Sequence, residues 1–541
     1  MKKTLSIIMA LCMVLSVCFF SVSAAEAKVG TVAADYKPEG TAITDAAGFA
    51  AMAADGIYYL ANDITLDASY AGPFKGTLDG NGKTLTVSAP MFASVENATI
   101  KNLTVIGAIT YTVAAGEIAP DAAAVATKAV GTVTFENIIN KADITGASYA
   151  AGIAAYVSGG TVTVTDCVNY GNIICSNKYD GFSYYNGGIV ARFGEDDSTA
   201  ANDNIIITNC TNYGDVTGNG PASGGILGYL VGGTTIKNCV NHGKILGMNN
   251  KAGGIFGTSI ITTKNVCAIA IENCINYGEV SSSKVVGGIA GRLGRAVQYP
   301  DLTYSVKNSI NYGNLSSYGE YTYTDVTLYM GGIVGYAYGG SKTPANEVSN
   351  CVNLGNITAD RSYLDASSKL YAGGIIAYVN AKNYICQNNV NIGTITVSGG
   401  EATAVGNILY NVKLDAAEAE ANNYSVKAID GAVDTFTNVV TADQIASGEV
   451  AYLINEAVGE TIYYQAIGTD KAPVSAPFAA GDGSNTILKN ADGTYGNPVK
   501  EVPEDTKPAD PVPTGDSALI FAVVAIISVL GIATVAKRRE N

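Results

Sequence analysis

The chain contains no tryptophan and a single histidine, His242, among its 541 residues. Ser-His-Asp and Cys-His catalytic arrangements each require an imidazole, so this one side chain confines both of them to a single location. The equivalent position of other repeats holds a tyrosine, at Tyr170, Tyr213, Tyr277 and Tyr312. We therefore predict that His242 is a surface turn residue and that the chain has no catalytic residue of these classes.

Charge is also scarce. Asp, Glu, Lys and Arg make up 15% of the residues, and the formal net charge is −15. An acidic chain repels phosphate backbones and anionic lipid surfaces, so the composition argues against nucleic acid and against an anionic membrane face as partners. Abundant Gly and Tyr with few charges favour a β-rich repeat protein over a disordered chain.

The spacings typical of metal and carboxylate chemistry are missing as well. No Cys-x₂-Cys pair suits a zinc site, and we expect no metal and no cofactor. The acidic groups that a glycosidase needs occur at 195–197 and as Asp360 with Asp365, but we predict that these are solvated loop charges. A polysaccharide lyase or a glycoside hydrolase is the alternative function.

The chain does contain one sequence motif, called the phrase below, that repeats along most of its length. Its clearest copy begins at Asn209-Cys210-Thr211-Asn212 and closes with a Gly-Gly-Ile-x-Gly segment at 224–228. Successive copies, anchored at the cysteine position, are separated by 29 to 43 residues. The anchors are Leu103, Ile138, Cys167, Cys210, Cys239, Cys274, Ser309, Cys351 and Asn389. A constant core with loops of variable length is typical of a solenoid.

The local pattern decides the kind of solenoid. Runs such as Thr161-Val162-Thr163-Val164-Thr165 alternate polar and apolar residues, which indicates strands and excludes arrays of helical hairpins. We predict an all-β chain folded as a right-handed parallel β-helix, with small helical caps and a C-terminal transmembrane helix.

With its Asn-Cys-x-Asn-x-Gly turns and Gly-Gly-Ile-x-Gly cores, the chain resembles proteins that carry GLUG motifs, the glycine-rich repeats of bacterial surface proteins. The resemblance covers about residues 57–470. It implies a pectate-lyase-like β-helix and a role outside the cell, as in some adhesins and in non-catalytic parts of large surface proteases. The Ser-Gly-Glu-Val-Ala-Tyr-Leu helix and the strand that follows it resemble the closing segment of such arrays.

The domain organisation follows from composition. The order of a charged start, an apolar run and small residues predicts a secretory signal peptide, and a long uncharged run before Lys537-Arg538-Arg539 predicts a membrane span. The predicted segments are a signal peptide at 1–25, an N-terminal cap with the first coils at 28–97 (including a helix over 44–54), the repeats at 98–411, a C-terminal cap at 412–497 (including a helix over 441–458), a Pro-rich acidic spacer at 498–517, the membrane or sorting helix at 518–536 and a basic cytoplasmic tail at 537–541.

The segment before that helix resembles a sortase sorting signal at Pro513-Thr514-Gly515. It departs from Leu-Pro-x-Thr-Gly because Val512 stands where the pattern has proline. Covalent attachment to the cell wall through Thr514, beside Gly515, and simple retention in the membrane are both open. Either route predicts an exported protein held on the surface of a Gram-positive-type cell.

Two residue sets are predicted to stack from coil to coil. The cysteine position interchanges with Leu and Ile, so we predict an inward column of thiols, with paired disulfides or a metal cluster as alternatives. We predict that the second Asn of the phrase adopts left-handed backbone and bonds the coils above and below. The predicted ladder residues are Cys167, Cys210, Cys239, Cys274 and Cys351 together with Asn140, Asn169, Asn212, Asn241, Asn276, Asn311, Asn353 and Asn391.

Recognition is predicted in the longest loops, because insertions at one repeat position emerge on one side of a solenoid. Loops 314–330 and 357–372 carry tyrosines among polar residues, which suits contact with sugar rings or a protein partner. The predicted ligand-contact residues are Tyr318, Tyr321, Tyr323, Tyr329, Tyr363 and Tyr371. We therefore expect a non-enzymatic adhesin or glycan-binding or protein-binding surface protein, and a passive stalk is the third possibility.

Overall fold

The computed structural model describes residues 29–112, 114, 117–175, 184–194, 204–259, 267–294, 302–319, 325–338, 346–380, 384–411, 422–432, 437–479 and 483–498. The chain divides into one unit over 1–498 and another over 499–541. The predicted signal peptide, the spacer after Pro498, the predicted membrane helix, the tail and the anchor residues Thr514 and Gly515 lie outside the described residues. Within the described ranges, no helix is long and apolar enough to span a membrane.

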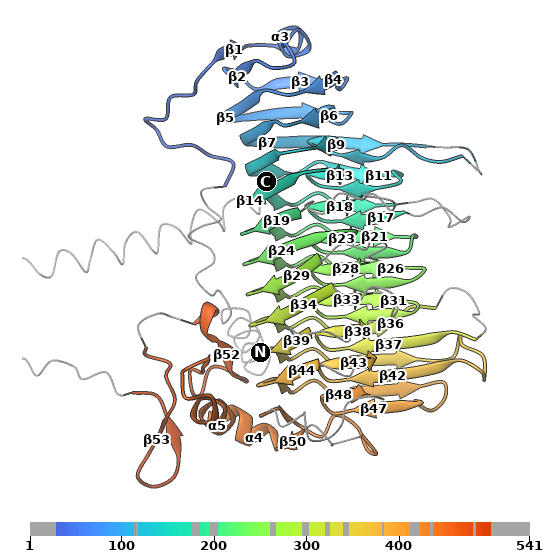
Figure 1. The fold of residues 1–541 in the computed structure, drawn as a ribbon, viewed down its shortest axis with the longest axis vertical. Coiled ribbons are helices and arrows are strands. Elements are labelled where there is room, and N and C mark those ends of the chain that lie inside the picture. The colour runs from blue at the N-terminus through green and yellow to red at the C-terminus, as the bar shows by residue number, and fades with distance from the viewer. Residues whose placement is uncertain are drawn as a thin grey trace, which may run out of the picture. The chain divides into compact units, whose positions relative to one another are not determined.

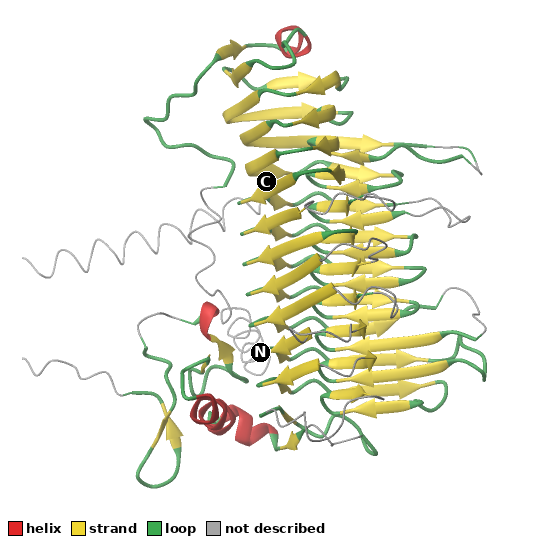
Figure 2. Ribbon diagram, viewed as in Figure 1, coloured by secondary structure: helices red, strands yellow, loops and turns green. Residues whose placement is uncertain are grey.

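The first unit is a parallel β-helix, in which strands of successive coils pair in parallel (Figure 1). Helices occur only in its terminal segments among the described residues (Figure 2). A full coil passes through four strand columns, called here sheets A, C, D and B. In the coil that begins at Gly233, β24 and β25 belong to sheet A, β26 to sheet C, β27 to sheet D and β28 to sheet B. The coarse fold predicted from the period-two pattern is therefore confirmed.

Sheet A carries the strands on both sides of the asparagine turn. They are β1 (Thr41–Ile43), β2 (Ile57–Leu60), β3 (Ile64–Leu66), β5 (Thr77–Val87), β7 (Thr99–Thr110), β10 (Val133–Asn140), β14 (Thr161–Thr165), β15 (Val168–Asn169), β19 (Asn204–Thr208), β20 (Thr211–Asn212), β24 (Gly233–Lys237), β25 (Val240–Asn241), β29 (Cys267–Glu272), β30 (Ile275–Asn276), β34 (Leu302–Lys307), β35 (Ile310–Asn311), β39 (Asn346–Ser349), β40 (Val352–Asn353), β44 (Tyr384–Gln387), β45 (Val390–Asn391), β49 (Tyr424–Ser425) and β50 (Asn438–Val439).

Sheet C follows it in each coil. Its strands are β11 (Asp143–Thr145), β16 (Ile173–Ile174), β21 (Val216–Gly218), β26 (Ile245–Gly247), β31 (Val280–Ser282), β36 (Leu315–Ser317), β41 (Ile357–Asp360) and β46 (Ile395–Ser398). Sheet D consists of β8 (Ala122–Ala123), β12 (Ala150–Ala151), β17 (Tyr185–Gly187), β22 (Ala222–Gly224), β27 (Lys251–Gly253), β32 (Val285–Gly287), β37 (Thr327–Gly331), β42 (Lys369–Gly373) and β47 (Ala404–Gly406). Sheet B consists of β4 (Tyr70–Phe74), β6 (Phe92–Glu96), β9 (Ala126–Val130), β13 (Ala154–Ser158), β18 (Val190–Phe193), β23 (Leu227–Leu230), β28 (Phe256–Ser259), β33 (Ala290–Leu293), β38 (Val334–Tyr338), β43 (Ile376–Asn380) and β48 (Leu409–Asn411).

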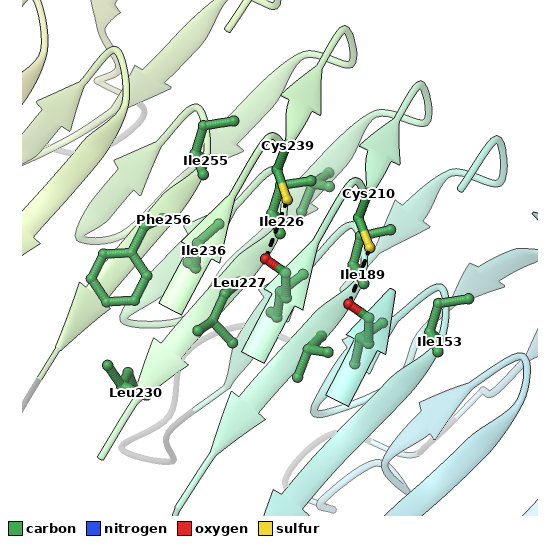
Figure 3. Close-up of a cluster of buried hydrophobic side chains, with 14 of the residues drawn as sticks. Ile153, Ile189, Cys210, Ile226, Leu227, Leu230, Ile236, Cys239, Ile255 and Phe256 are labelled. Atoms are coloured by element: carbon green, nitrogen blue, oxygen red, sulfur yellow. Dashed lines mark hydrogen bonds between the residues drawn. The ribbon is translucent and has the colours of Figure 1, made fainter. Parts of the chain in front are cut away.

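Identical repeat positions lie on top of one another inside the helix. In β14 the inward Val162 and Val164 are buried, and they pair in register with Ile205 and Ile207 of the next coil. Figure 3 shows the same stacking for Ile153, Ile189, Ile226 and Ile255, each of which follows a glycine in its coil, and for Cys210 and Cys239. Each coil therefore covers the apolar face of its neighbour, which is how a solenoid obtains a continuous core.

The first Asn of the phrase, not the second, adopts the left-handed backbone. Asn209 has φ 56° and Asn238 has φ 55°, and Asp166 replaces Asn at this turn with φ 51°. The second Asn lies at the end of a short strand, as Asn212 ends β20. This corrects the sequence prediction. Only the first Asn sits where the strand direction changes, and Asn is the non-glycine residue that tolerates that geometry best.

The N-terminal cap contains β1 and then α3 (Ala46–Ala50), which is shorter than the predicted helix over 44–54. Asp45 is its N-cap and accepts a hydrogen bond from Gly48 N at 2.8 Å. Phe49 of this helix is buried, with its ring 5.6 Å from that of Phe92 and 6.4 Å from that of Tyr70. The helix therefore places an aromatic plug against the first coils.

The C-terminal cap contains α4 (Ala442–Ala446), α5 (Glu449–Val458), η2 (Ala476–Phe478) and the antiparallel pairs β51 (Tyr463–Tyr464) with β52 (Val474–Ser475) and β53 (Leu488–Lys489) with β54 (Tyr495–Gly496). The prediction of a single helix over 441–458 is wrong. Gly448 has φ 87°, which ends α4 and caps α5. The cap packs on the outer face of sheet A, where Ile445 and Ile454 share a cluster with Val352 and Val390.

Candidate functional site

The most prominent surface feature is the corner where sheets D and B follow one another in each coil. Tyr329 on β37 and Tyr336 on β38 both alternate with inward core residues and so point outward. Their ring centroids are nevertheless only 4.7 Å apart. Two outward side chains on successive strands meet only if the outer faces of the two sheets are inclined toward each other. We call this surface the aromatic corner.

Parallel register extends the aromatic corner over many coils. On sheet D the column is Tyr149, Tyr185, Ala222, Lys251, Val285, Tyr329, Tyr371 and Ala404. On sheet B it is Lys128, Tyr156, Arg192, Tyr229, Thr258, Arg292, Tyr336 and Tyr378. Tyr410, on β48, continues the column beside Tyr378. Aromatic residues therefore flank a middle section that carries cations.

The Gly-Gly-Ile segment makes this bend possible by close approach. A Cβ on Gly225 would lie 2.0 Å from Gly254 O and 2.5 Å from Asn241 Cγ, so no larger residue fits. Asn241 is fully buried, and its amide lies directly against this glycine. The second Asn of the phrase and the glycine pair thus pack directly against each other at the corner.

The asparagines at this position form an interior hydrogen-bonded column. Asn241 donates through Nδ2 to Gly243 O and to Asn276 Oδ1, both at 2.8 Å, and accepts from Asn212 Nδ2 at 2.8 Å. The column contains Asn140, Asn169, Asn212, Asn241, Asn276, Asn311, Asn353 and Asn391, and it ends at Ser425. These residues are structural and support the corner from within.

The cysteine column is structural as well. Cys167, Cys210, Cys239, Cys274 and Cys351 are buried and free among the described residues. The thiol of Cys239 contacts Lys237 O at 3.3 Å and Ile207 O at 3.6 Å, and Figure 3 shows the second contact. Burial raises the pKa of the Cys351 thiol to about 12. The Cys351 thiol is therefore protonated and inert at neutral pH.

The C-terminal part of the aromatic corner is a tyrosine cluster. Its ring centroids are 4.7 to 6.2 Å apart, and the rings are partly exposed. The members are Tyr329, Tyr336, Tyr338, Tyr371, Tyr378 and Tyr410. Burial raises the pKa of Tyr329 to about 12, and the positive charge of Arg292 lowers it only in part. The hydroxyl group of Tyr329 is therefore a neutral hydrogen-bonding group over the physiological range.

The N-terminal part is built around Arg192. Its guanidinium carbon lies 5.3 to 5.7 Å from the ring centroids of Tyr149, Tyr156, Tyr185 and Tyr229. It donates to Tyr149 Oη at 2.8 Å and to Gly194 O at 3.1 Å. Burial raises the pKa of the nearby Asp121, and the charge of Arg192 opposes that shift. Arg192 is 7% exposed, so this part is a packed cation–π cluster with little free surface.

The predicted ligand-contact residues are divided between two places. Tyr329 and Tyr371 lie in the aromatic corner, with ring centroids 5.6 Å apart. Tyr318 and Tyr363 lie in the loops that connect sheets C and D, where a Cβ on Gly319 would be 2.1 Å from the Tyr363 ring. Tyr321 and Tyr323 lie outside the described residues.

The acidic residues considered for catalysis brace their own loop. Asp360 accepts from Ser362 N and Ser362 Oγ at 2.9 Å, and these bonds lower its pKa. Asp365 accepts from Ser367 and Ser368, and hydrogen bonds from these serines lower its pKa. Both carboxylates are thereby held ionised. The acidic run at 195–197 lies outside the described residues.

His242 belongs to a second stack of rings on the turn after the second Asn. Its ring is parallel to those of Tyr213 and Tyr277, at 4.6 and 4.8 Å. Tyr170 and Tyr312 continue the stack at either end. His242 is exposed at this turn, and no group of three His, Cys, Asp or Glu residues that could hold a metal ion occurs in the described ranges.

Sequence reasoning missed the sheet B half of the corner and its cations. A signal was present, because the outward residues stand four positions before and three positions after the isoleucine of each Gly-Gly-Ile segment. Around Ile333 these are Tyr329 and Tyr336, and around Ile255 they are Lys251 and Thr258. Sequence reasoning did not assign these residues to one site, because the pattern does not indicate that the outer faces of the two sheets incline toward each other.

No protein-family profile matches the chain, and no curated protein matches it. A similar solved structure is that of "a putative immunoglobulin A1 protease" from Bacteroides ovatus, with 13% sequence identity and a TM-score of 0.32. The alignment covers 86% of this chain and 100% of that chain. A likeness at this score and identity says nothing about function, and the GLUG resemblance stays a prediction.

Proposed function

We propose that the protein binds glycans on the outside of the cell, as an adhesin-like β-helix whose contact surface is the aromatic corner. The observation that carries this proposal is the partly exposed cluster of Tyr329, Tyr336, Tyr371, Tyr378 and Tyr410. Tyrosine offers an apolar ring face and a hydroxyl group on one rigid side chain, which suits the mixed surface of a sugar.

The spacing of the rings supports an elongated ligand. Along the stack, Tyr336 and Tyr378 are 5.5 Å apart, and Tyr371 and Tyr410 are 5.4 Å apart. Because the paired rings are stacked on one another, an oligosaccharide that lies along the stack meets a new ring edge at each coil. A rigid scaffold also holds the rings in place before binding, which reduces the entropy lost on association.

The cellular setting is part of the proposal. The signal-peptide pattern, the resemblance to GLUG-motif surface proteins and the segment 512–541 support export and display on a cell wall or membrane of Gram-positive type. The partners would be host or environmental glycans, or glycosylated proteins.

The direct test is a glycan-array measurement on the full chain and on a double variant, Tyr336→Ala with Tyr378→Ala. A matched control is Tyr170→Ala with Tyr213→Ala, which removes a stacked pair at 4.8 Å from the other ring stack. Each stacked tyrosine contributes on the order of 1 kcal/mol, so the corner variant should lose about 30-fold in affinity. The control should bind like the unmodified chain.

Two further arms separate the alternatives. Tyr363→Ala tests the loop surface, and a loss there with no loss in the corner variant would move the contact surface to the loops. Incubation of each bound glycan with the protein, followed by product analysis, tests for a polysaccharide lyase or hydrolase. Equal binding by all variants, with thermal unfolding unchanged, would reject the proposal and favour the passive stalk.

A further inference from the structure

A second surface follows the outer face of sheet A along the helix axis. Each coil contributes three positions to it: the first Asn of the phrase, the residue after the cysteine position, and the residue after the second Asn. In one coil these are Asn238 and His242, which are exposed, and between them Val240, which is 7% exposed. We call the three columns the amide row, the buried row and the ring row, and together the axial strip.

The side chains of the amide row bond to one another along the axis. Asn238 donates through Nδ2 to Asn209 Oδ1 and accepts from Asn273 Nδ2, both at 3.1 Å. An amide nitrogen carries two N–H groups and an amide oxygen two lone pairs, so one donor and one acceptor of each residue remain. The described residues supply no second partner for these three amides.

The N-terminal segment of this chain covers one end of the axial strip. Gly30 donates through its main-chain N–H to Asn137 Oδ1 at 2.6 Å, and Asn137 Nδ2 donates to Thr31 O at 3.0 Å. A Cβ on Gly30 would lie 2.8 Å from Ile139 Cδ1 in the buried row, and Gly30 has φ 72°. One side-chain amide of the row therefore pairs with a peptide main chain, and a glycine lies against the buried row.

The same segment continues along the axis. Tyr36 donates a hydrogen bond to Asp79, and Asn102 Nδ2 donates to Tyr36 Oη at 3.3 Å and to Asp79 Oδ1 at 3.1 Å. Asp79 and Asn102 belong to the two coils that precede the coil of Asn137. Residues 30–36 thus cross three coils of the strip.

The C-terminal cap covers the opposite end of the axial strip. Val352 and Val390 of the buried row share an apolar cluster with Ile445 of the cap. Tyr463 Oη donates to the main-chain oxygen of Asn388, in the amide row, at 2.7 Å. Both ends of the strip therefore bind polypeptide segments of this chain.

The middle four coils present the same three rows. The members are Asp166, Asn209, Asn238 and Asn273 in the amide row, Val168, Thr211, Val240 and Ile275 in the buried row, and Tyr170, Tyr213, His242 and Tyr277 in the ring row. Parallel register places this part between Ile139 and Ile310, which the N-terminal segment and the cap contact. The buried row is 3 to 7% exposed here, so a ligand meets mainly the outer rows, where Asn209 and Asn238 are exposed and Tyr170 is 43% exposed.

We propose that the middle of the axial strip, from the coil of Asp166 to that of Asn273, binds a glycine-containing polypeptide segment of another protein. The open N–H and C=O groups of the amide row pair with its main chain, as Asn137 pairs with Gly30 and Thr31. The exposed rings pack on its side chains. At about 4.8 Å per coil the four coils extend over about 19 Å, which corresponds to about six residues of extended chain.

The continuity of the strip identifies this occupant. The two ends of the same three rows already hold polypeptide, and a peptide main chain offers the alternating donors and acceptors that a row of amides accepts. The axial strip is separate from the aromatic corner, so the inference goes beyond the proposed glycan binding and does not depend on it.

The probe is a labelled decapeptide with the sequence of residues 29–38, together with a printed set in which every position except the glycine is varied. Binding to the full chain is measured by fluorescence anisotropy. The test variant combines Asn209→Gly with Asn238→Gly, and the control combines Asn350→Gly with Asn388→Gly beside the cap. Glycine retains the left-handed backbone at all four positions, and thermal unfolding is checked for each variant.

Loss of two amide pairs should weaken peptide binding by about 30-fold, and the control should bind like the unmodified chain. A probe with Gly30→Val should not bind, because a side chain at that position meets the buried row. The variants of the two ring surfaces give a reciprocal readout. Tyr170→Ala with Tyr213→Ala should lose the peptide and keep glycans, whereas Tyr336→Ala with Tyr378→Ala should keep the peptide.

Equal binding by the Asn209→Gly and Asn238→Gly variant, or no binding by any printed peptide, would overturn the proposal. A loss in Asn137→Gly alone would do so as well, because the peptide would then be exchanging with the chain's own N-terminal segment. Sedimentation velocity tests a second copy as the occupant. Self-association that the Asn209→Gly and Asn238→Gly variant lacks would assign the strip to that copy and overturn the choice of a foreign partner. Failure of glycan binding leaves each of these results unchanged.

Discussion

Removal of one amide from the interior asparagine column should destabilise the whole β-helix. In Asn241→Ala the chain loses the bonds from Nδ2 to Gly243 O and Asn276 Oδ1 and the bond from Asn212 Nδ2, all at 2.8 Å. A net hydrogen bond contributes about 1 kcal/mol, and a buried acceptor left without a donor costs about 1 to 3 kcal/mol. With three bonds lost, we therefore expect the free energy of unfolding to fall by about 4 to 6 kcal/mol.

The matched control lies three residues earlier. Asn238 is exposed, has φ 55° and belongs to the outer asparagine ladder, with bonds of 3.1 Å to Asn209 and Asn273. Asn238→Gly keeps the left-handed backbone accessible and removes only hydrogen bonds that water can replace. Its free energy of unfolding should change by less than about 1 kcal/mol.

The assay is urea unfolding followed by far-UV circular dichroism and by tyrosine fluorescence, which the absence of tryptophan leaves unobscured. The shift in midpoint, multiplied by the slope with urea, gives the change in free energy if both probes coincide. Because coils contact only their neighbours, unfolding that begins at Asn241 would separate the two probes. An Asn241→Ala midpoint equal to that of Asn238→Gly would refute the assigned role of the interior column.

Four further outcomes follow. The thiols of the cysteine column should not react with a thiol reagent at pH 8 in the folded protein and should react in denaturant, since all five are buried away from the reagent; rapid native reaction would contradict their placement. Gly225→Ala should prevent folding or shorten the ordered array by circular dichroism, whereas Gly72→Ala, with no atom closer than 3.8 Å to the added carbon, should unfold like the unmodified chain. Because the pKa of Lys251 is lowered in the folded protein, the unfolded state binds more protons above about pH 7. The free energy of unfolding should therefore rise from about pH 7 toward pH 10 relative to that of Lys251→Met. Parallel profiles of the two free energies against pH would show that the ammonium is not buried. Deletion of 512–541 should release the protein into the medium, and cell association that persists would argue against that segment as the anchor.

Several features of the fold were accessible from the residues alone because they depend on local repetition. The alternation in Thr161–Thr165 places Val162 and Val164 on one face of a strand, and a fixed phrase makes equivalent residues stack. Other features of the fold could not be predicted from the residues alone. The helix predicted over 441–458 has strong apolar periodicity, yet Gly448 with φ 87° breaks it, and the left-handed residue is Asn209, not Asn212.

The candidate site was likewise predicted only in part from the sequence. Tyr329 and Tyr371 were identified from loop length and aromatic content, while Tyr336, Tyr378 and Lys251 were passed over. Periodicity assigns each of these side chains to the outside of its strand. It does not state which outward faces approach one another, since that depends on the direction in which the chain bends between strands.

The sequence by itself determined that this protein is a stack of parallel coils, because period-two strands and a recurrent Asn-Cys-x-Asn phrase allow an apolar face to be covered only by the next copy. The tertiary structure alone decided which outward side chains gather into one surface. Gly225 packs closely on Asn241 where sheets D and B follow one another, and there side chains from separate strands come together in one surface of tyrosines around Lys251.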